Sequence, residues 1–441
     1  MPTWLTQDIA FPADFVWGTA SSSHQAEGNN VHNDWWDWEQ QPGRIVHGQC
    51  SGRGNNFYER YDGDFSLLAH LGLNQFRLSL EWSRIEPEEG RIDSGAVDHY
   101  RRVLEAAQRN GITPWVNLHH FALPRWFAAK GGFLEEANLS YWRRHVERVT
   151  AALATFADHW HPINEANAYA GGSYLLGAMP PGHTDLGEFQ RVLRNTLLMY
   201  RDAYQILKTA RPQLQVGTIH VMIPVFPANP DDESDRLLAA NFDGLFNAPP
   251  LLALRDGVIA LPGREPETVA DLKGAADFFG ANYYCGVSVD HRQPMRMTPY
   301  PPGQTRLNQI GNGVYPEGLF DVLQRVQQTN LGIPIYVAEN GTGTDDDCWR
   351  IEYIAQHLVQ VKRAIDAGCD VRGYFHWTSV DNFEWNHGWT APFGLIGFDP
   401  VTFERKPRPS AHFLSLVAKR NSLRISDVRE ALCVDGLDRR A

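Results

Sequence analysis

Two glutamates in the sequence each follow a short run that is typical of a buried strand. The run HPIN ends immediately before Glu165, and the run IPIYVA ends immediately before Glu339. A single carboxylate in such a place is more often a solvated loop residue or a helix cap. A pair that meets across a pocket suits cleavage of a glycosidic bond, in which one carboxyl protonates the leaving oxygen and the other meets the developing oxocarbenium ion. This chemistry requires a fold that brings the two glutamates together.

Polar and aromatic side chains also stand on or just after other strand-like runs. They are Gln25 and Glu27, Arg77, His119 and His120, Asn164, Asn282, Tyr283 and Tyr284, Asn340, and Trp377. Sugar rings stack on aromatic faces, and the chain has 14 tryptophans. Taken alone, several polar residues have a structural explanation, namely a surface ion pair (Arg77), a satisfied core histidine (His120), a loop cap (Gln25) or a structural acid (Glu384). The pattern becomes informative only if these residues converge.

The elements that must position these residues alternate between strand and helix patterns. Eight β-rich runs are each followed by a stretch with apolar residues at helical spacing, which predicts a parallel sheet with crossover helices. The expected strands cover residues 15–20, 74–82, 113–119, 160–164, 214–223, 277–283, 333–338 and 372–376. One α/β fold, a single (β/α)8 TIM barrel with long βα loops, accounts for this order and gathers the carboxyl ends of all strands at one face.

Domain organisation follows from the same pattern. The chain has 441 residues and shows no Pro/Ser linker or shift in composition, so residues 1–441 are predicted to form one catalytic barrel domain. A doubly wound open sheet is the alternative, although no GxGxxG motif follows a strand. Among the helices, Asn56 and Glu59 predict a capping box at the start of one near residue 57.

Composition and charge restrict the partners. The formal net charge is -12 and basic residues form no stripe, which argues against a nucleic-acid partner. The longest uncharged stretch, residues 166–182, is broken by glycines and prolines, so no membrane span is expected. Five cysteines without a CxxC pair, and an N-terminus without a leader pattern, favour a reducing compartment and predict a cytoplasmic enzyme.

Nine motifs along the chain resemble those of a known family. They are FPADFVWGTASSSHQAEG, FRLSLEWSRIEP, NLHHFALPRWF, INEANAY, YLLGAMPPG, GANYY, YVAENGTG, GYFHWTSVDNFEWNHGW and FGLIGFD, in this order and over nearly the whole length. The chain is similar to glycoside hydrolase family 1, the retaining β-glucosidases and β-galactosidases. Any one motif is a weak match, whereas nine in order are specific.

The resemblance implies a role for each matching residue. Glu165 would be the general acid/base and Glu339 the nucleophile of a double displacement, with Arg77, Asn164 and Tyr284 in support. The residues implied to bind the sugar are Gln25, His120, Asn164, Asn282, Trp377, Glu384 and Trp385. No metal and no cofactor are implied. The family's mechanism needs only these side chains and water.

The resemblance also implies a substrate class. Members that act on 6-phosphorylated sugars carry a serine, a lysine and a tyrosine in the last sugar-facing loop and lack a Glu-Trp pair. This chain has the pair Glu384-Trp385, and Ala391 and Phe393 stand at the positions aligned with that lysine and tyrosine. The expected substrates are therefore terminal, non-reducing, non-phosphorylated β-D-glucosides: cellobiose, short cello-oligosaccharides, and aryl or alkyl β-glucosides. Side activity on β-galactosides and β-fucosides is expected, and either could be the main activity. The sequence leaves the oligomeric state open.

Three positions depart from the family pattern. Ala166 replaces the proline of the usual Asn-Glu-Pro, Phe121 replaces a tryptophan that often follows His120, and Glu81 stands where a smaller residue is usual. Alanine lacks the fixed φ of proline, so the turn after Glu165 is expected to be less constrained. Phenylalanine keeps an apolar wall and loses an N–H donor. These changes are expected to alter selectivity more than to abolish activity.

Two other hypotheses use the same residues differently. His159 and His161 alternate on a strand and His119 lies close in a barrel, so a zinc- or iron-dependent barrel hydrolase is conceivable. Barrel amidohydrolases, however, are expected to carry His-x-His on the first strand, and residues 15–20 contain none. A sugar-binding protein without catalysis is the other hypothesis. A pure binder would have no need to keep Glu165 and Glu339 with their supporting residues.

Overall fold

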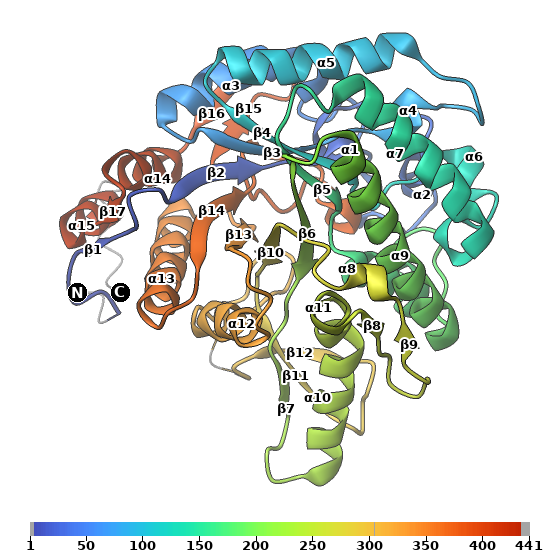
Figure 1. Cartoon of the computed structure of the whole chain (residues 1–441). Helices are drawn as coiled ribbons and strands as arrows, with labels where there is room; N and C mark the ends of the chain where they lie inside the picture. The colour runs from blue at the N-terminus through green and yellow to red at the C-terminus, as the bar shows by residue number, and fades with distance from the viewer. Residues whose placement is uncertain (1–3, 304, 434–441) are drawn as a thin grey trace.

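Eight parallel strands close into a barrel at the centre of the molecule (Figure 1). The computed structural model describes residues 4–303 and 305–433. The barrel strands, in order around the closed sheet, are β2 (Val16–Ala20), β3 (Gln75–Ser79), β4 (Thr113–His119), β5 (His159–Ile163), β6 (Gln215–Val221), β10 (Phe278–Asn282), β13 (Ile335–Asn340) and β14 (Val371–Trp377). Each of the eight expected strands is present, and the predicted barrel fold is confirmed.

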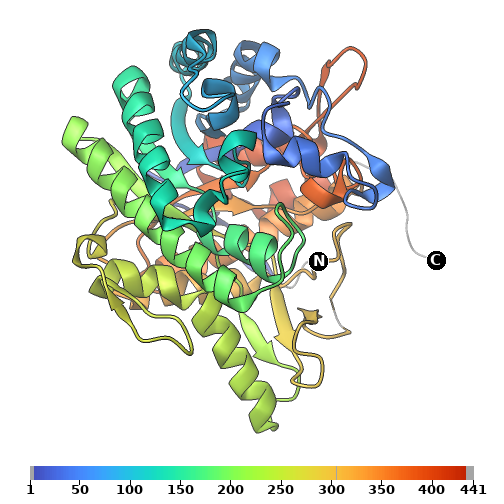
Figure 2. The same ribbon diagram turned by 90° about the vertical axis from the view of Figure 1, so that its right-hand side faces the viewer.

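Helices cover the outside of the barrel between successive strands. The larger ones are α3 (Phe57–Leu71), α5 (Ser94–Arg109), α7 (Leu139–Leu153), α9 (Leu186–Ala210), α12 (Glu317–Gln328), α13 (Asp347–Asp366) and α14 (Pro409–Arg420). Figure 2 shows the long helices α7 and α9 lying side by side, and residues of the two helices contact each other. Their apolar faces and the outer faces of the strands form the main hydrophobic core.

Two helix starts show how local sequence sets the boundaries. The side chain of Asp93 accepts a hydrogen bond of 3.1 Å from the backbone N–H of Ala96 and so caps α5. The capping box predicted at Asn56 is wrong. Asn56 has a left-handed backbone with φ of 63°, and the described structure contains no bond from its side chain to the helix start. Capping requires an extended residue before the helix, which this turn does not provide.

The remaining helices and strands lie outside the barrel sheet. They comprise the strands β1 (Ile9–Ala10), β7 (Val225–Pro227), β8 (Val258–Ile259), β9 (Glu267–Thr268), β11 (Gly286–Val289), β12 (Met297–Tyr300), β15 (Ile396–Phe398), β16 (Arg405–Pro407) and β17 (Ser422–Leu423), and the helices α1 (Ser23–Ala26), α2 (Asp34–Glu39), α4 (Trp82–Ile85), α6 (Arg125–Ala128), α8 (Ala166–Ala170), α10 (Glu233–Phe246), α11 (Ala248–Asp256) and α15 (Ile425–Cys433). β7, β11 and β12 form a small sheet beside α10, which projects from the barrel (Figure 1). β1 pairs with β17, so segments near the two ends of the chain lie together.

The barrel interior is packed by aromatic side chains, most of them from the amino-terminal halves of the strands. Trp115, Phe278 and Phe375 form a buried aromatic cluster there, and Val16 and Tyr336 pack against it. An aromatic plug of this kind closes one end, so the polar side chains of the strands can gather only toward the other end.

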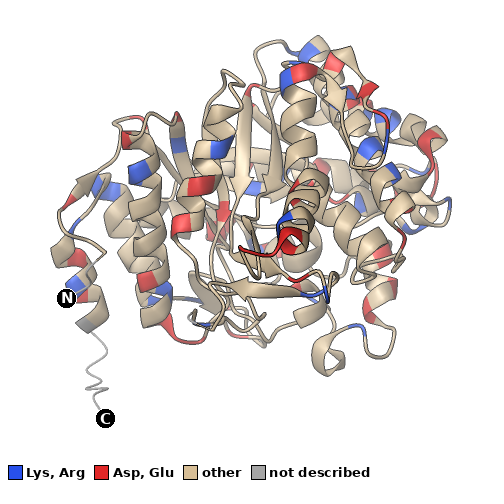
Figure 3. Ribbon diagram, turned by 90° about the horizontal axis from the view of Figure 1, so that it is seen from below, with Lys and Arg blue, Asp and Glu red and all other residues tan. Residues whose placement is uncertain are grey.

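The surface carries charges of both signs. Figure 3 shows acidic and basic residues interspersed along the elements. None of the helices in the described part of the chain is long and apolar enough to cross a lipid bilayer. The single domain expected for residues 1–441 stays a prediction.

Candidate active site

Glu339, near the end of β13, is held by two donors at the open end of the barrel. Its Oε1 accepts a hydrogen bond of 2.9 Å from Nη1 of Arg77, and its Oε2 accepts one of 2.6 Å from the hydroxyl of Tyr284. Arg77 and Glu339 are both almost fully buried. Each carboxylate oxygen therefore has a strong partner, and the orientation of the side chain is fixed.

Arg77 is itself fixed on several sides. Besides Glu339, its guanidinium donates to the carbonyl oxygen of Ala338 at 2.6 Å and to Oδ1 of Asn164 at 2.8 Å. Its Nε also lies 3.4 Å from Nε2 of His161 on β5. Arg77 is only 2% exposed, which contradicts the alternative explanation that it forms a surface ion pair.

Glu165 lies directly after β5 in a left-handed turn, with φ of 51° and ψ of 59°. Its backbone N–H donates to the carbonyl of Ile219 at 2.9 Å, which ties the turn to β6. Nδ2 of Asn282 donates to Oε1 of Glu165 at 2.6 Å and approaches Oδ1 of Asn164 at 3.4 Å. Asn282 therefore links the two glutamate environments, because Asn164 also accepts from Arg77.

The two carboxyl groups differ in their electrostatic surroundings. Burial, and then the nearby charge of Glu339, raise the pKa of Glu165 to about 8. Burial also raises the pKa of Glu339, but the positive charge of Arg77 and the Tyr284 hydroxyl oppose that rise. The pair therefore places its negative charge on Glu339 and its proton on Glu165 near neutral pH.

Polar side chains from the segments that follow four barrel strands, β2, β4, β5 and β14, lie beside the glutamates. Nε2 of Gln25 donates to Oε2 of Glu384 at 3.2 Å and to the carbonyl of Phe383 at 3.0 Å. Nδ2 of Asn164 and Nε2 of His120 lie 3.3 Å apart. Burial raises the pKa of Glu384 to about 8. These groups form an array of donors and acceptors suited to sugar hydroxyls.

Aromatic rings form a wall next to this array. The imidazole of His120 stacks on Trp377 with centroids 5.8 Å apart and on Trp385 with centroids 6.1 Å apart. Trp385 is backed by Trp35 at 4.5 Å and by the stacked ring of His24 at 5.9 Å. The backing rings prevent Trp385 from turning away, so the wall is rigid.

The structure brings together the residues predicted for the site. Contacts, including a hydrogen bond between Trp377 and Glu384, join the following residues: Arg77, Glu339, Tyr284, Asn164, Asn282, Glu165, His120, Trp377, Trp385, Glu384 and Gln25. Three other residues noted at strand ends point elsewhere. His119 lies between Phe133 and Tyr169, Tyr283 donates to the carbonyl of Tyr315, and Glu27 pairs with Arg84.

The three histidines of the metal hypothesis do not form one site. His159 stacks on Trp115 in the barrel plug with centroids 4.1 Å apart, whereas His161 faces Arg77. Within residues 4–303 and 305–433, no group of three possible ligands includes any of these histidines. The alternation of His159 and His161 therefore serves the packing of the barrel interior and the support of Arg77.

Sequence reasoning missed the roles of several supporting residues. His161 supports Arg77, and Nδ2 of Asn340 donates to the carbonyl of Tyr283 at 2.8 Å, which fixes the end of β13 beside Glu339. Asn167 is fully buried and bonds to two distant carbonyl groups. A polar residue inside a strand pattern was the available signal for His161, but nothing in the sequence indicates the partners of Asn167.

Two departures from the family pattern have clear surroundings. Glu81 is 2% exposed and accepts hydrogen bonds from the hydroxyls of Ser23 at 2.7 Å and Ser83 at 2.6 Å. It thereby fixes the segment that carries Gln25. The ring of Phe121 packs against Trp385, with centroids 5.2 Å apart, and Phe121 has a left-handed backbone with φ of 69°.

Comparisons with known proteins agree with the fold. Residues 7–423 match glycosyl hydrolase family 1, and the chain belongs to this family of enzymes. It is similar to the solved β-glycosidase from Pyrococcus horikoshii, with a TM-score of 0.87, 36% identity, and coverage of 96% of this chain and 98% of that chain. β-Glucosidase A from Thermotoga maritima is 28% identical over 94% of this chain and 98% of its own length. The 6-phospho-β-galactosidase 1 of Streptococcus pneumoniae is 30% identical over 91% and 97%, respectively.

Proposed function

We propose that the chain hydrolyses terminal, non-reducing, non-phosphorylated β-D-glucosides with retention of configuration. The observation that carries this proposal is that the two buried carboxyl groups have different hydrogen-bond partners. Glu339 is paired with Arg77 and Tyr284, whereas among the described residues the side chain of Glu165 accepts a hydrogen bond only from the neutral amide of Asn282, at 2.6 Å. One carboxylate is thus prepared as an anion and the other as an acid, as a double displacement requires.

In the first step, the carboxylate of Glu339 attacks the anomeric carbon while the carboxyl of Glu165 protonates the departing glycosidic oxygen. The covalent ester removes the charge of Glu339, and this charge contributes to the raised pKa of Glu165. The pKa of Glu165 then falls, so the same group accepts a proton from the attacking water in the second step. Water releases the sugar, and Glu339 regains its negative charge.

The sugar pocket favours an uncharged glycone. Gln25 and Glu384 would bind hydroxyl groups of the sugar, and Trp377 and Trp385 would contact its faces. The buried side chains of Ala391 and Phe393 form an apolar cluster with Ala20 and Trp377 and carry no positive charge for a phosphate group. A 6-phosphate beside the carboxyl of Glu384 would leave a charge unpaired, which is costly in a buried site.

A panel of 4-nitrophenyl β-glycosides tests the substrate. We expect the highest kcat/KM for the glucoside, lower values for the galactoside and fucoside, and a value roughly 100-fold lower or less for a 6-phosphoglucoside. A higher value for the galactoside or fucoside would assign the main activity to that sugar. Proton NMR of the first product tests the stereochemistry, and the β-anomer is expected to appear first.

The same assays separate the other hypotheses. Absence of turnover with every β-glycoside would leave a sugar-binding protein. Activity that is lost on prolonged dialysis against a chelator and regained with zinc would support the metal-dependent hydrolase; we expect the activity to persist. The cysteine pattern supports a cytoplasmic location, and Cys285 and Cys369 are buried and not in disulfides.

A further inference from the structure

Asn167 forms an unusual buried connection two residues after Glu165. It lies in the short helix α8, which begins at Ala166, and its side chain is fully buried. Nδ2 donates to the carbonyl oxygen of Val221 at 2.7 Å and to that of Phe246 at 3.1 Å. Both partners are acceptors, so the orientation of the amide is unambiguous. One side chain thereby ties α8 to the end of β6 and to the end of α10.

The turn that this connection follows needs restraint. Glu165 has a left-handed backbone, which a residue with a side chain adopts only where the surrounding structure holds it. The backbone N–H of Glu165 bonds to Ile219, and its carbonyl accepts from Tyr169 at 2.9 Å. Ala166, the next residue, lacks the fixed φ that a proline would provide. The hydrogen bonds of Asn167 are the nearest side-chain restraint after the turn.

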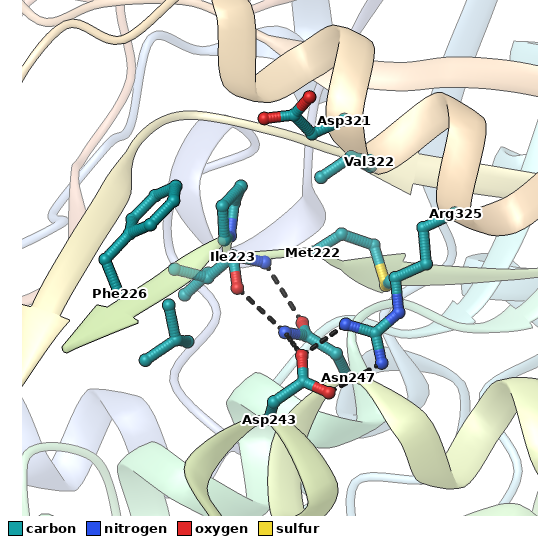
Figure 4. A pocket seen from close by; sticks show the side chains of 10 residues that line it. Met222, Ile223, Phe226, Asp243, Asn247, Asp321, Val322 and Arg325 are labelled. Carbon is teal, nitrogen blue, oxygen red and sulfur yellow. Dashed lines mark hydrogen bonds and ion pairs between the residues drawn. The ribbon is translucent and has the colours of Figure 1, made fainter. Parts of the chain in front are cut away.

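The far end of the connection is also anchored. The side chain of Asn247, next to Phe246, accepts from the N–H of Ile223 at 3.0 Å and donates to the carbonyl of Ile223 at 2.7 Å. It also donates to Asp243, which forms an ion pair with Arg325 of α12 (Figure 4). The carbonyl of Phe246 is therefore a fixed point, and a bond to it can hold α8 in place.

We propose that Asn167 is a positioning residue that holds the carboxyl of Glu165 in line with the glycosidic oxygen. The two hydrogen bonds of Asn167 fix the first turn of α8, and the first turn of α8 fixes the left-handed turn of Glu165. Asn282 then needs only to orient the carboxyl group itself. The buried Oδ1 of Asn167 has no hydrogen-bond partner in the described residues, and leaving a buried acceptor unpaired costs free energy. The two bonds donated by Nδ2 are therefore the favourable hydrogen bonds of this side chain.

Substrates with different leaving groups test this role, which rests on the proposed function. A dinitrophenolate leaves without a proton, whereas an alkoxide needs the acid. We expect Asn167→Leu, which keeps the size and removes both donors, to lower kcat/KM on methyl β-glucoside about tenfold or more. On 2,4-dinitrophenyl β-glucoside kcat/KM should change less than about twofold. Azide should raise kcat on the activated substrate and give the β-glucosyl azide, because deglycosylation then needs no base.

Asn195→Leu is the matched control, because Asn195 is also fully buried and also donates to two backbone carbonyls, those of Phe133 at 2.9 Å and Leu134 at 3.4 Å. It lies outside the connection of Asn167, and we expect its loss to affect both substrates by equal factors. An equal loss on both substrates in Asn167→Leu, or the same selective loss in Asn195→Leu, would overturn the positioning role. If Asn167→Leu shows no cooperative unfolding transition, the losses of kcat/KM on the two substrates are compared in Asn167→Ser and Asn167→Asp instead. Glu165→Ala distinguishes a failure of the proposed function from a failure of this inference. If Glu165→Ala lacks the selective loss on methyl β-glucoside, the proposed function fails. If Glu165→Ala shows that loss and Asn167→Leu does not, only this inference fails.

Discussion

The guanidinium of Arg77 and the carboxylate of Glu339 form an ion pair of 2.9 Å with side chains that are 2% and 4% exposed. A buried charge pair of this kind is costly to form and stabilises folding little. Its value lies in what it does to Glu339, because a fixed cation keeps the carboxylate ionised where burial alone would protonate it.

Removal of the Glu339 carboxylate should abolish hydrolysis. Glu339→Ala is expected to reduce kcat on 2,4-dinitrophenyl β-glucoside by at least roughly 10⁴-fold, because no covalent intermediate can form. Added azide occupies the vacated space and should restore turnover with an inverted product, the α-glucosyl azide. The stereochemistry is read by NMR. Residual hydrolysis with a retained product would contradict the assignment of Glu339 as the nucleophile.

Removal of the Tyr284 hydroxyl should move the acid limb of the pH profile. The hydroxyl donates to Oε2 of Glu339 at 2.6 Å and lowers the pKa of that carboxyl. In Tyr284→Phe the pKa of Glu339 rises, so kcat/KM should start to fall at a higher pH as the solution is acidified. A hydrogen bond to a charged group contributes about 1.5–3 kcal/mol, or roughly a 10- to 100-fold loss of kcat/KM. An unchanged acid limb would show that Tyr284 does not act on Glu339.

The alkaline limb should report Glu165. Because its pKa is raised to about 8, the acid is present below that pH and is lost as the pH rises through it. Wild-type kcat/KM on a poor leaving group should therefore fall above about pH 8. In Glu165→Gln the remaining activity on an activated substrate should lack this limb. Glu384→Gln is the control, because burial raises the pKa of Glu384 to about 8 as well; retention of the limb there assigns it to Glu165.

Stability should depend on pH through the same group. The pKa of Glu165 is raised in the folded state from 4.5 to about 8, so the folded protein favours the neutral carboxyl. The contribution to stability is fully present below pH 4.5 and is lost as the pH rises toward 8. Glutamine does not titrate, so Glu165→Gln should gain in Tm over the wild type as the pH increases, on the order of a few degrees. Calorimetry at pH 5 and pH 8.5 measures the difference, and equal differences at both would contradict a raised pKa.

The barrel could be predicted from the sequence because each strand is a short apolar run followed by a helical stripe. β4 even has the expected bounds, Thr113–His119. Glu165 and Glu339 were found because a carboxylate directly after a buried run is conspicuous. Their partners were harder to find. The bond from Asn282 to Glu165 joins residues 117 apart in the chain, and its existence depends on the curvature of the closed sheet. At Asn56 the local sequence predicted a helix cap that is not formed, because the residue adopts a left-handed turn.

The last strand of the barrel pairs with the first. β14 lies beside β2, with Trp377 opposite Ala20 and Gly373 opposite Val16. During synthesis, residues 16–20 leave the ribosome long before residues 371–377, so the sheet cannot close until residues 371–377 have been made. Gln25 likewise cannot donate its hydrogen bond to Glu384 before Glu384 has been made. A nascent chain arrested before β14 would hold both glutamates and still lack a site, so catalytic competence should begin only after β14 has been made.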